Sequence, residues 1–249
     1  MMYPGGNEVN VAALTTRYGQ SSSYIGCVGS DIYGTLIRDA LEQEGVDLSH
    51  CHVMDDVNTF TEIFHANGER EFGKIRRGAS THCTLSDEDT AFILDHRLLH
   101  TGFYSRMEEF LEAHHDELLI SFDFTEYADE EYLQKYLPYV DIAFVSAAVD
   151  HDLSPDHLKK YYALGPEIVI LTMGSKGAYL YDGDLYFQPA VEIEEVVDTL
   201  GAGDSFISRF LVEYLRNTPA QSALQLAAEA AAETCQYYGA FDHGMPIPE

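Results

Sequence analysis

The chain has 249 residues, of which 46% are hydrophobic, so it is long enough to bury the core of one large α/β domain. Its 14 Lys and Arg against 42 Asp and Glu give a formal net charge of −28 at pH 7. Proteins that bind nucleic acid or lie on anionic lipid need a basic face, so we expect neither a nucleic-acid nor a membrane partner. The sequence has no run of 18 apolar residues, and no secretory signal pattern at its N-terminus.

The four cysteines, Cys27, Cys51, Cys83 and Cys235, are scattered and form no CxxC pair. This spacing shows no metal-site pattern, and a chain of this length needs no disulfide in order to fold. We therefore expect a cytoplasmic protein whose thiols are reduced.

Strand and helix patterns alternate along most of the chain. Strands are expected at 23–28, 58–66, 71–75, 98–101, 118–124, 142–145, 168–172, 178–181, 185–188 and 193–197. Helices are expected at 31–44, 86–95, 107–115, 130–136, 155–164, 203–216 and 219–238. Gly45 is placed to end the first helix, and Ser86, Ser154 and Thr218 are placed to cap the helices that follow them.

Repeated strand–helix–strand units predict a mostly parallel central sheet with helices on both faces, which is a three-layer α/β/α fold. Two strands around Asn67-Gly68 interrupt this order, and Asn-Gly is a strong hairpin signal. We expect a single domain over residues 1–249, in which the hairpin at about 57–77 forms a small β-flap, or lid.

The segment 198–206, Asp-Thr-Leu-Gly-Ala-Gly-Asp-Ser-Phe, is the most informative in the sequence. Two glycines around an alanine let the backbone approach a ligand closely and point consecutive N–H groups toward it. The helix that follows adds the positive end of its dipole, which suits a phosphoryl group or a developing anion. Asp204, in the first turn of that helix, is placed to accept a proton from a substrate hydroxyl. The alternative is a glycine-rich turn that Asp204 merely caps.

This segment resembles the C-terminal signature of the PfkB, or ribokinase-like, carbohydrate kinases. Three further stretches are similar to motifs of that family, in the family's order: Gly-Gly-Asn-Glu-Val-Asn-Val-Ala at 5–12, Gly-Cys-Val-Gly-Ser-Asp-Ile-Tyr-Gly at 26–34 and Leu-Thr-Met-Gly-Ser-Lys-Gly at 171–177. The resemblance extends over nearly the whole chain. It implies a ribokinase-like, Rossmann-like fold and an ATP-dependent transfer of a phosphoryl group to a sugar hydroxyl.

The resemblance also assigns roles to the matching positions. Asp204 would be the general base that deprotonates the sugar hydroxyl. The transferred phosphoryl group would be held by the backbone amides of Gly201, Ala202 and Gly203. The sugar would be bound by Gly5, Gly6, Asn7 and Asn10.

The nucleotide and ion positions follow from the same resemblance. The ATP site would be lined by Thr172, Gly174, Ser175 and Gly177. Mg²⁺ would bridge the nucleotide phosphates, and a monovalent cation would lie near Asp198 and Thr199.

The sequence departs from the family pattern in three places. Only four residues precede Gly5, where the family carries a central strand with a substrate carboxylate, so we expect that first strand to be missing and its neighbours to have exposed edges. The Asn-x-x-Glu segment that organises Mg²⁺ is replaced at 146–150, with an acid only at Asp150. The Asp-x-Asn-x-Arg segment reads Asp-Phe-Thr-Glu-Tyr at 123–127. A truncated or non-catalytic protein that binds nucleotide or sugar is therefore an alternative.

Within the family, the segments 122–124, 144–147 and 236–240 resemble the fructoselysine 6-kinase branch, which tolerates the last two departures. This implies a fructosamine such as fructoselysine as substrate, phosphorylated at O6, with fructose or ribose as alternatives. Family members often pair through the lid, so a homodimer is also an expectation.

Two charged stretches leave alternatives open. Residues 107–131 hold ten Asp and Glu and no Lys or Arg, so they are either solvated surface or attract a cationic substrate. The hairpin also carries a basic cluster of Arg70, Lys74, Arg76 and Arg77. These side chains either bind a carboxylate or phosphate of the substrate, or they are solvated. The Gly-x4-Gly-Lys pattern at 68–74 is not a P-loop, because Ile75 takes the place of Ser or Thr.

Overall fold

The computed structural model describes residues 1–66, 69–147 and 154–247. Its α-helices are α1 (Asn7–Arg17), α2 (Ile32–Glu44), α3 (Asp87–Leu94), α4 (Glu108–His114), α5 (Glu130–Tyr136), α6 (Pro155–Tyr162), α7 (Ala202–Leu215) and α8 (Ala220–Thr234). Its 3₁₀ helices are η1 (Ala79–His82), η2 (Leu137–Tyr139) and η3 (Gly174–Lys176). Its strands are β1 (Gly26–Gly29), β2 (Cys51–Met54), β3 (Phe60–Ala66), β4 (Glu69–Arg76), β5 (Leu98–Gly102), β6 (Leu119–Asp123), β7 (Ile142–Ser146), β8 (Ile168–Thr172), β9 (Ala178–Tyr181) and β10 (Leu185–Gln188). In this part of the chain, no helix has the length and apolar character needed to cross a membrane.

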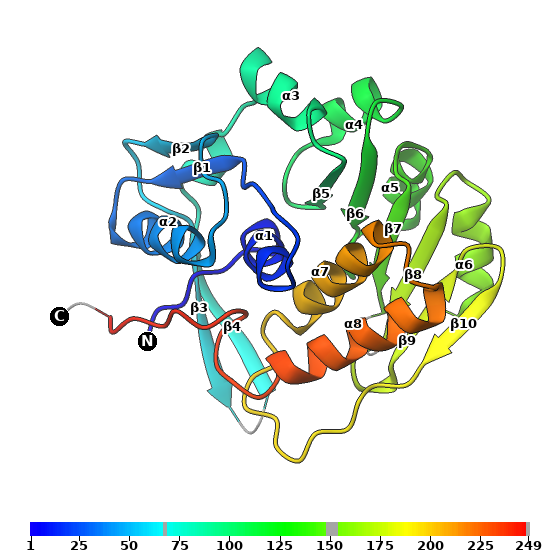
Figure 1. Ribbon diagram of the computed structural model, residues 1–249. Coiled ribbons are helices and arrows are strands. Elements are labelled where there is room, and N and C mark those ends of the chain that lie inside the picture. The colour runs from blue at the N-terminus through cyan, green and yellow to red at the C-terminus, as the bar shows by residue number, and fades with distance from the viewer. Residues whose placement is uncertain (67–68, 148–153, 248–249) are drawn as a thin grey trace.

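A six-stranded sheet in the order β10-β9-β8-β7-β6-β5 forms the centre of the molecule (Figure 1). Strands β5 to β8 are parallel, and β9 and β10 add an antiparallel hairpin. The register pairs Gly102 with Asp123 and Ser146 with Thr172, so the carboxyl ends of the parallel strands lie at one end of the sheet. Open parallel sheets bind their ligands at that end.

Both faces of this sheet are buried. Ile142 and Phe144 pack with α7 and α8 on one face, which Figure 1 shows crossing in front of the sheet. Ala143 and Val145 pack with α4, α5 and α6 on the other face. Successive side chains of a strand alternate between faces, so a continuous apolar run is what a sheet covered on both sides requires. The predicted three-layer α/β/α architecture is confirmed.

Two smaller sheets accompany the main one. β1 and β2 pair in parallel, and β3 and β4 form the antiparallel hairpin expected from the sequence, whose turn at 67–68 lies outside the described residues. Within the described ranges, β1 pairs with β2 alone and β5 pairs with β6 alone, so each keeps one edge without a neighbouring strand. Helix α1 packs against α2, β5 and α7 and thereby connects the small parallel sheet to the main body.

Local capping signals place several helix ends where the sequence predicts them. Asp31 caps α2 by accepting hydrogen bonds from two backbone N–H groups, and Gly45 ends that helix in the left-handed conformation. Ser86 and Ser154 form capping boxes at α3 and α6. These capping interactions join residues within one turn, so the sequence shows them directly.

Some local predictions are wrong, because other contacts of the folded chain use the same groups. Residues 193–197 form no strand, since the N–H of Val197 donates to the carbonyl of Cys235 at 2.8 Å and not to a neighbouring strand. Thr218 does not cap α8, because its hydroxyl donates to Glu213 at 2.6 Å. Two elements are not among the predicted ones: α1, which begins inside the glycine motif, and the short, half-exposed strand β2.

Cys27 and Cys83 form a disulfide, so the expectation of four reduced thiols is wrong. The two residues are 56 positions apart in sequence, yet β1 and η1 pack together and bring their Cα atoms to 5.4 Å. Sequence spacing carries no information about that packing. Cys51 and Cys235 remain thiols.

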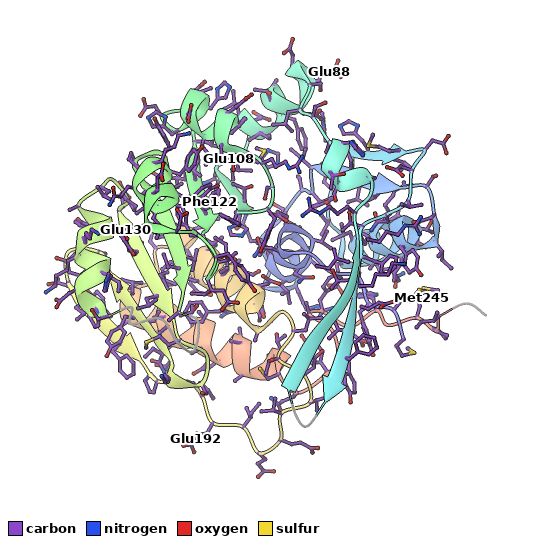
Figure 2. The ribbon with its side chains drawn as sticks, turned by 180° about the vertical axis from the view of Figure 1, so that it is seen from behind. Glu88, Glu108, Phe122, Glu130, Glu192 and Met245 are labelled. Carbon is purple, nitrogen blue, oxygen red and sulfur yellow. A yellow bond between two sulfur atoms is a disulfide. The ribbon has the colours of Figure 1, made fainter. Side chains whose placement is uncertain are left out.

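Asp89, Asp198 and Glu213 are buried, and most of the other acidic side chains that the structure describes lie at the surface. Figure 2 labels four of them on separate elements: Glu88 on α3, Glu108 on α4, Glu130 on α5 and Glu192 after β10. Such a distribution leaves most of the charge in solvent, where the repulsion between carboxylates is screened.

Candidate active site

The predicted sugar-binding and catalytic residues meet at the carboxyl ends of β5 and β6. Gly6 is the N-cap of α1 with φ 116°, which favours glycine, and Asn7 and Asn10 follow in the first turn. Residues three apart on a helix lie on the same face. Because α1 packs on α7, that face meets Asp204 in the first turn of α7. Gly5 comes just before, and a Cβ there would meet no atom within 4 Å.

Asp204 is held by two side-chain amides. Nδ2 of Asn7 donates to its Oδ1 at 2.9 Å, and Nδ2 of Asn10 donates to its Oδ2 at 2.6 Å. Burial raises the pKa of Asp204 to about 6. The hydrogen bonds from both asparagines lower this pKa, and the nearby charge of Glu8 raises it. A half-buried carboxylate with a raised pKa and fixed orientation has the properties of a general base that works near neutral pH.

Asp123 is a second carboxylate beside the first, and the sequence analysis did not assign it to the site. It ends β6, and its Oδ2 accepts a hydrogen bond of 3.0 Å from the same Nδ2 of Asn7. Burial, and then the charges of Asp204 and Glu8, raise its pKa to about 7, although the N–H of Thr125 lowers it. Its place at the carboxyl end of a parallel strand was the signal that could have marked it.

The segment before α7 forms the predicted glycine turn. Gly201 is the N-cap of α7 with φ 78°, and no side chain in the described residues caps this helix. A Cβ on Gly203 would meet no atom within 4 Å, so the space beside the first turn is open. The N–H of Ala202 donates to the carbonyl of Thr199 at 3.3 Å, but no side chain among the described residues caps the turn. A helix N-terminus without a side-chain cap favours an anion, and this one lies in the same turn as Asp204.

The predicted nucleotide residues lie on a separate turn, two strands along the sheet from Asp123. Thr172 ends β8, and its hydroxyl is 3.0 Å from that of Ser146 at the end of β7. η3 follows and contains Gly174 and Ser175. Gly177 then adopts φ 98°, and a Cβ there would lie 2.1 Å from the carbonyl oxygen of Gln188. The structure therefore places these residues at the same end of the sheet as Asp204, in a separate group.

Asp198 ties the glycine turn to the C-terminal segment. It is buried, and its carboxylate accepts hydrogen bonds from the N–H of Leu200 at 3.0 Å and from the N–H of Gly239 at 3.2 Å. Thr199 follows it and accepts from the N–H of Ala202 through its carbonyl. The carboxylate thus stabilises the turn directly, and its role toward a cation stays a prediction.

Three members of the basic hairpin cluster, Lys74, Arg76 and Arg77, have no hydrogen bond to the residues that hold Asp204. Lys74, Arg76 and Arg77 are exposed, and the side chain of Arg70 lies outside the described residues. Asp150, the acid at the shifted Mg²⁺ position, also lies outside the described residues. The structure leaves both alternatives for the hairpin charges open.

Solved kinase structures share this architecture. The structure of ribokinase from Arabidopsis thaliana, complexed with ribose and ATP, superposes with a TM-score of 0.81 at 22% identity, over 95% of this chain and 83% of that one. A ribokinase II-like protein of E. coli in complex with ATP and Mg²⁺ gives a TM-score of 0.80 at 22% identity, over 96% and 84% of the two chains. The fold is therefore ribokinase-like.

The sequence comparisons identify the family. The profile of the pfkB family carbohydrate kinases matches residues 1–247. A fructosamine kinase of Bacillus subtilis is 38% identical over 253 residues, which are 98% of this chain and 88% of the relative. Fructoselysine 6-kinase of Escherichia coli is 35% identical over 240 residues, 96% of this chain and 92% of the relative. The chain belongs to the pfkB family and is a carbohydrate kinase, as the motifs predict.

Proposed function

We propose that this kinase transfers the γ-phosphoryl group of ATP to a hydroxyl of a fructosamine, with O6 of fructoselysine as the preferred acceptor. The observation that carries the proposal is the carboxylate of Asp204, held by Asn7 and Asn10 in the uncapped first turn of α7. The 38% and 35% identities to relatives named fructosamine kinase and fructoselysine 6-kinase support the choice of acceptor.

The chain's own residues account for the steps of such a transfer. Asp204 takes the proton of the attacking hydroxyl, and its two amide partners keep the receiving oxygen in place. The backbone amides of Gly201, Ala202 and Gly203 hold the transferred phosphoryl group. The sugar lies against Gly5, Gly6, Asn7 and Asn10. Phosphoryl transfer needs mostly positioning and charge stabilisation, which these groups supply.

The charge around the site suits an acceptor that carries an amine. Glu8, Asp123 and Asp204 lie close enough for the charge of Glu8 to raise the pKa of both aspartates. A cationic amine relieves this repulsion, whereas a plain sugar does not. A fructosamine carries such an amine beside its sugar, so these carboxylates support a fructosamine over fructose or ribose.

The nucleotide site would be formed by Thr172, Gly174, Ser175 and Gly177. When bound with ATP, Mg²⁺ neutralises the phosphate charge. In the described residues, no three His, Cys, Asp or Glu side chains are grouped to hold a metal, which fits an ion held mainly by phosphates and water. A monovalent cation would lie near Asp198 and Thr199, beside the glycine turn that Asp198 anchors.

The proposal predicts that fructoselysine stimulates ADP release more strongly than fructose or ribose does, in the presence of ATP and Mg²⁺. The KM for fructoselysine should rise when the ionic strength increases from about 0.01 to 1 M, because salt screens the attraction of the negatively charged protein for a cationic acceptor as the Debye length falls from ~30 to ~3 Å. The KM for fructose should change much less. Coupled-enzyme assays with each acceptor at several salt concentrations provide the measurement.

Two results would contradict the proposal. If no sugar or fructosamine stimulates ADP release, the protein is a non-catalytic binding protein, and isothermal titration with ATP and fructoselysine would test that alternative. If fructose or ribose is the better acceptor, the amine is not recognised by these carboxylates. If salt changes all KM values equally, the negative charge of the protein does not favour the amine.

We propose further that the chain is one kinase domain over residues 1–249 and forms a homodimer through its lid at 57–77. The β3–β4 hairpin exposes two large apolar side chains, Phe64 at 55% and Ile75 at 60%, which supports a partner on this surface. Replacing Ile75 with Lys should shift a dimer to a monomer in sedimentation velocity, with the far-UV spectrum unchanged. A wild-type protein that stays monomeric at high concentration would refute the dimer.

A further inference from the structure

His100 lies on β5 between the catalytic end of α1 and the neighbouring strand. Its Nε2 is 3.1 Å from Oδ1 of Asn7, and its Nδ1 is 3.0 Å from the hydroxyl of Ser121 on β6. The amino-acid patterns marked this residue only as part of a short apolar strand. The structure instead places it one hydrogen bond away from the amide that holds Asp204.

The contacts determine which nitrogen of His100 carries the proton. An amide oxygen can only accept, so Nε2 must donate to Oδ1 of Asn7. Burial lowers the pKa of the imidazole to about 3, so the ring is neutral near pH 7. Nδ1 then has a lone pair and accepts a hydrogen bond from the hydroxyl of Ser121.

The two carboxylates fix the orientation of Asn7 independently of the tautomer. With its oxygen directed at His100, its Nδ2 faces the two carboxylates and uses one hydrogen on each, at 3.0 Å to Asp123 and 2.9 Å to Asp204. The opposite orientation would place the amide oxygen against two carboxylate oxygens at these distances, which is repulsive. Nε2–H of His100 and the two carboxylates therefore favour the same orientation.

We propose that His100 is a positioning residue for the phosphoryl transfer: its Nε2–H fixes the amide of Asn7, which in turn holds Asp204 in the orientation that receives the proton. The inference rests on the proposed role of Asp204. Because His100 reaches the reacting atoms only through Asn7, its loss should lower kcat and leave the KM for ATP unchanged.

Two replacements separate this role from simple packing. The amide nitrogen of Gln in His100→Gln reaches about as far as Nε2 and can donate to Asn7. The shorter Asn in His100→Asn reaches about as far as Nδ1, so it keeps the partner Ser121 and loses the donor to Asn7. We expect His100→Asn to lose about 10–100-fold in kcat, as removal of a supporting hydrogen bond at a site commonly does. His100→Gln should retain the larger part of kcat.

The experiment measures kcat, both KM values and the melting temperature of the wild type and the two variants. Equal losses in both variants, or a full kcat in His100→Asn, would overturn the proposal. A second measurement does not depend on activity: ¹⁵N spectra of histidine-labelled protein at pH 7 should show His100 as the neutral Nε2–H tautomer. An Nδ1–H tautomer or an imidazolium would overturn the proposal. If the tautomer is as expected but Asp204→Asn leaves ADP release unchanged, Asp204 is not the base and the positioning role of His100 fails with it, while the hydrogen-bond assignment stands. If no acceptor stimulates ADP release in the wild type, the proposed function itself fails.

Discussion

Replacing Asp204 with Asn is expected to lower kcat by about 10²–10⁴-fold, the usual cost of losing a well-placed general base. Asn has the same shape but cannot take the proton of the sugar hydroxyl. Oδ1 of the new Asn can still accept from Asn7. Its Nδ2 can donate to Oδ1 of Asn10 if the amide of Asn10 rotates by 180°, because that oxygen has no hydrogen-bond partner among the described residues. The loss should therefore appear in the chemistry and not in the fold, as measured by ADP release.

The melting temperature is the control for this variant. Burial raises the pKa of Asp204 to about 6, which means that the folded protein disfavours the charged form. A neutral Asn should therefore cost little stability at pH 7. A variant that keeps full kcat while folded would exclude Asp204 as the base.

The pKa of Asp204 also fixes the sign of the pH dependence. The base must be ionised, so wild-type kcat/KM should fall as the pH decreases through about 6, well above the ordinary value of an aspartate. In Asp204→Asn, this dependence should disappear from the residual activity. A wild-type profile that stays flat down to pH 5 would contradict the assignment.

The sequence predicts the glycine turn before α7 well because its pattern is local. Two glycines, a helix start and Asp204 lie within one short run, and the structure keeps them together. The hydrogen-bond partners of Asp204 cannot be predicted in the same way. Asn7 and Asn10 reach Asp204 only because α1 packs against α7. The family pattern points to these asparagines, but it does not show what they hold.

The residues that sequence reasoning missed act across strands. Asp123 and His100 end or interrupt apolar strands and look like core positions until the parallel register brings β5 and β6 together. The disulfide between Cys27 and Cys83 depends in the same way on the packing of β1 against η1. A one-dimensional pattern shows which element a residue belongs to, but not which element lies beside it.

Replacing Gly201 with Ala should affect both the fold and the reaction. Gly201 has φ 78°, which an alanine adopts only with strain, and its added Cβ would lie 2.2 Å from Cβ and 2.5 Å from Cα of the buried Ala240. The turn must move to relieve this contact. We expect a loss of more than about 1 kcal/mol in the free energy of unfolding, because the substituted residue cannot adopt the native conformation without strain.

The displaced turn should also lower kcat by about 10²–10³-fold, the range found when a donor to a developing anion is removed. The N–H groups of Ala202 and Gly203 follow Gly201 directly, so they move with it. Steady-state ADP release and chemical denaturation of the same preparation measure both effects.

Two companion variants separate a steric cause from a general loss of glycine. Gly203→Ala adds its Cβ to open space, so its free energy of unfolding should stay near that of the wild type. The double variant Gly201→Ala with Ala240→Gly removes the Cβ at 2.2 Å but keeps the Cα at 2.5 Å and the strained φ, so it should recover part of the lost stability. A Gly201→Ala variant that is as stable and active as the wild type would contradict this account. The close approach of Gly201 to Ala240 would then not hold the turn, and the backbone amides of this segment would not be fixed as the reaction requires.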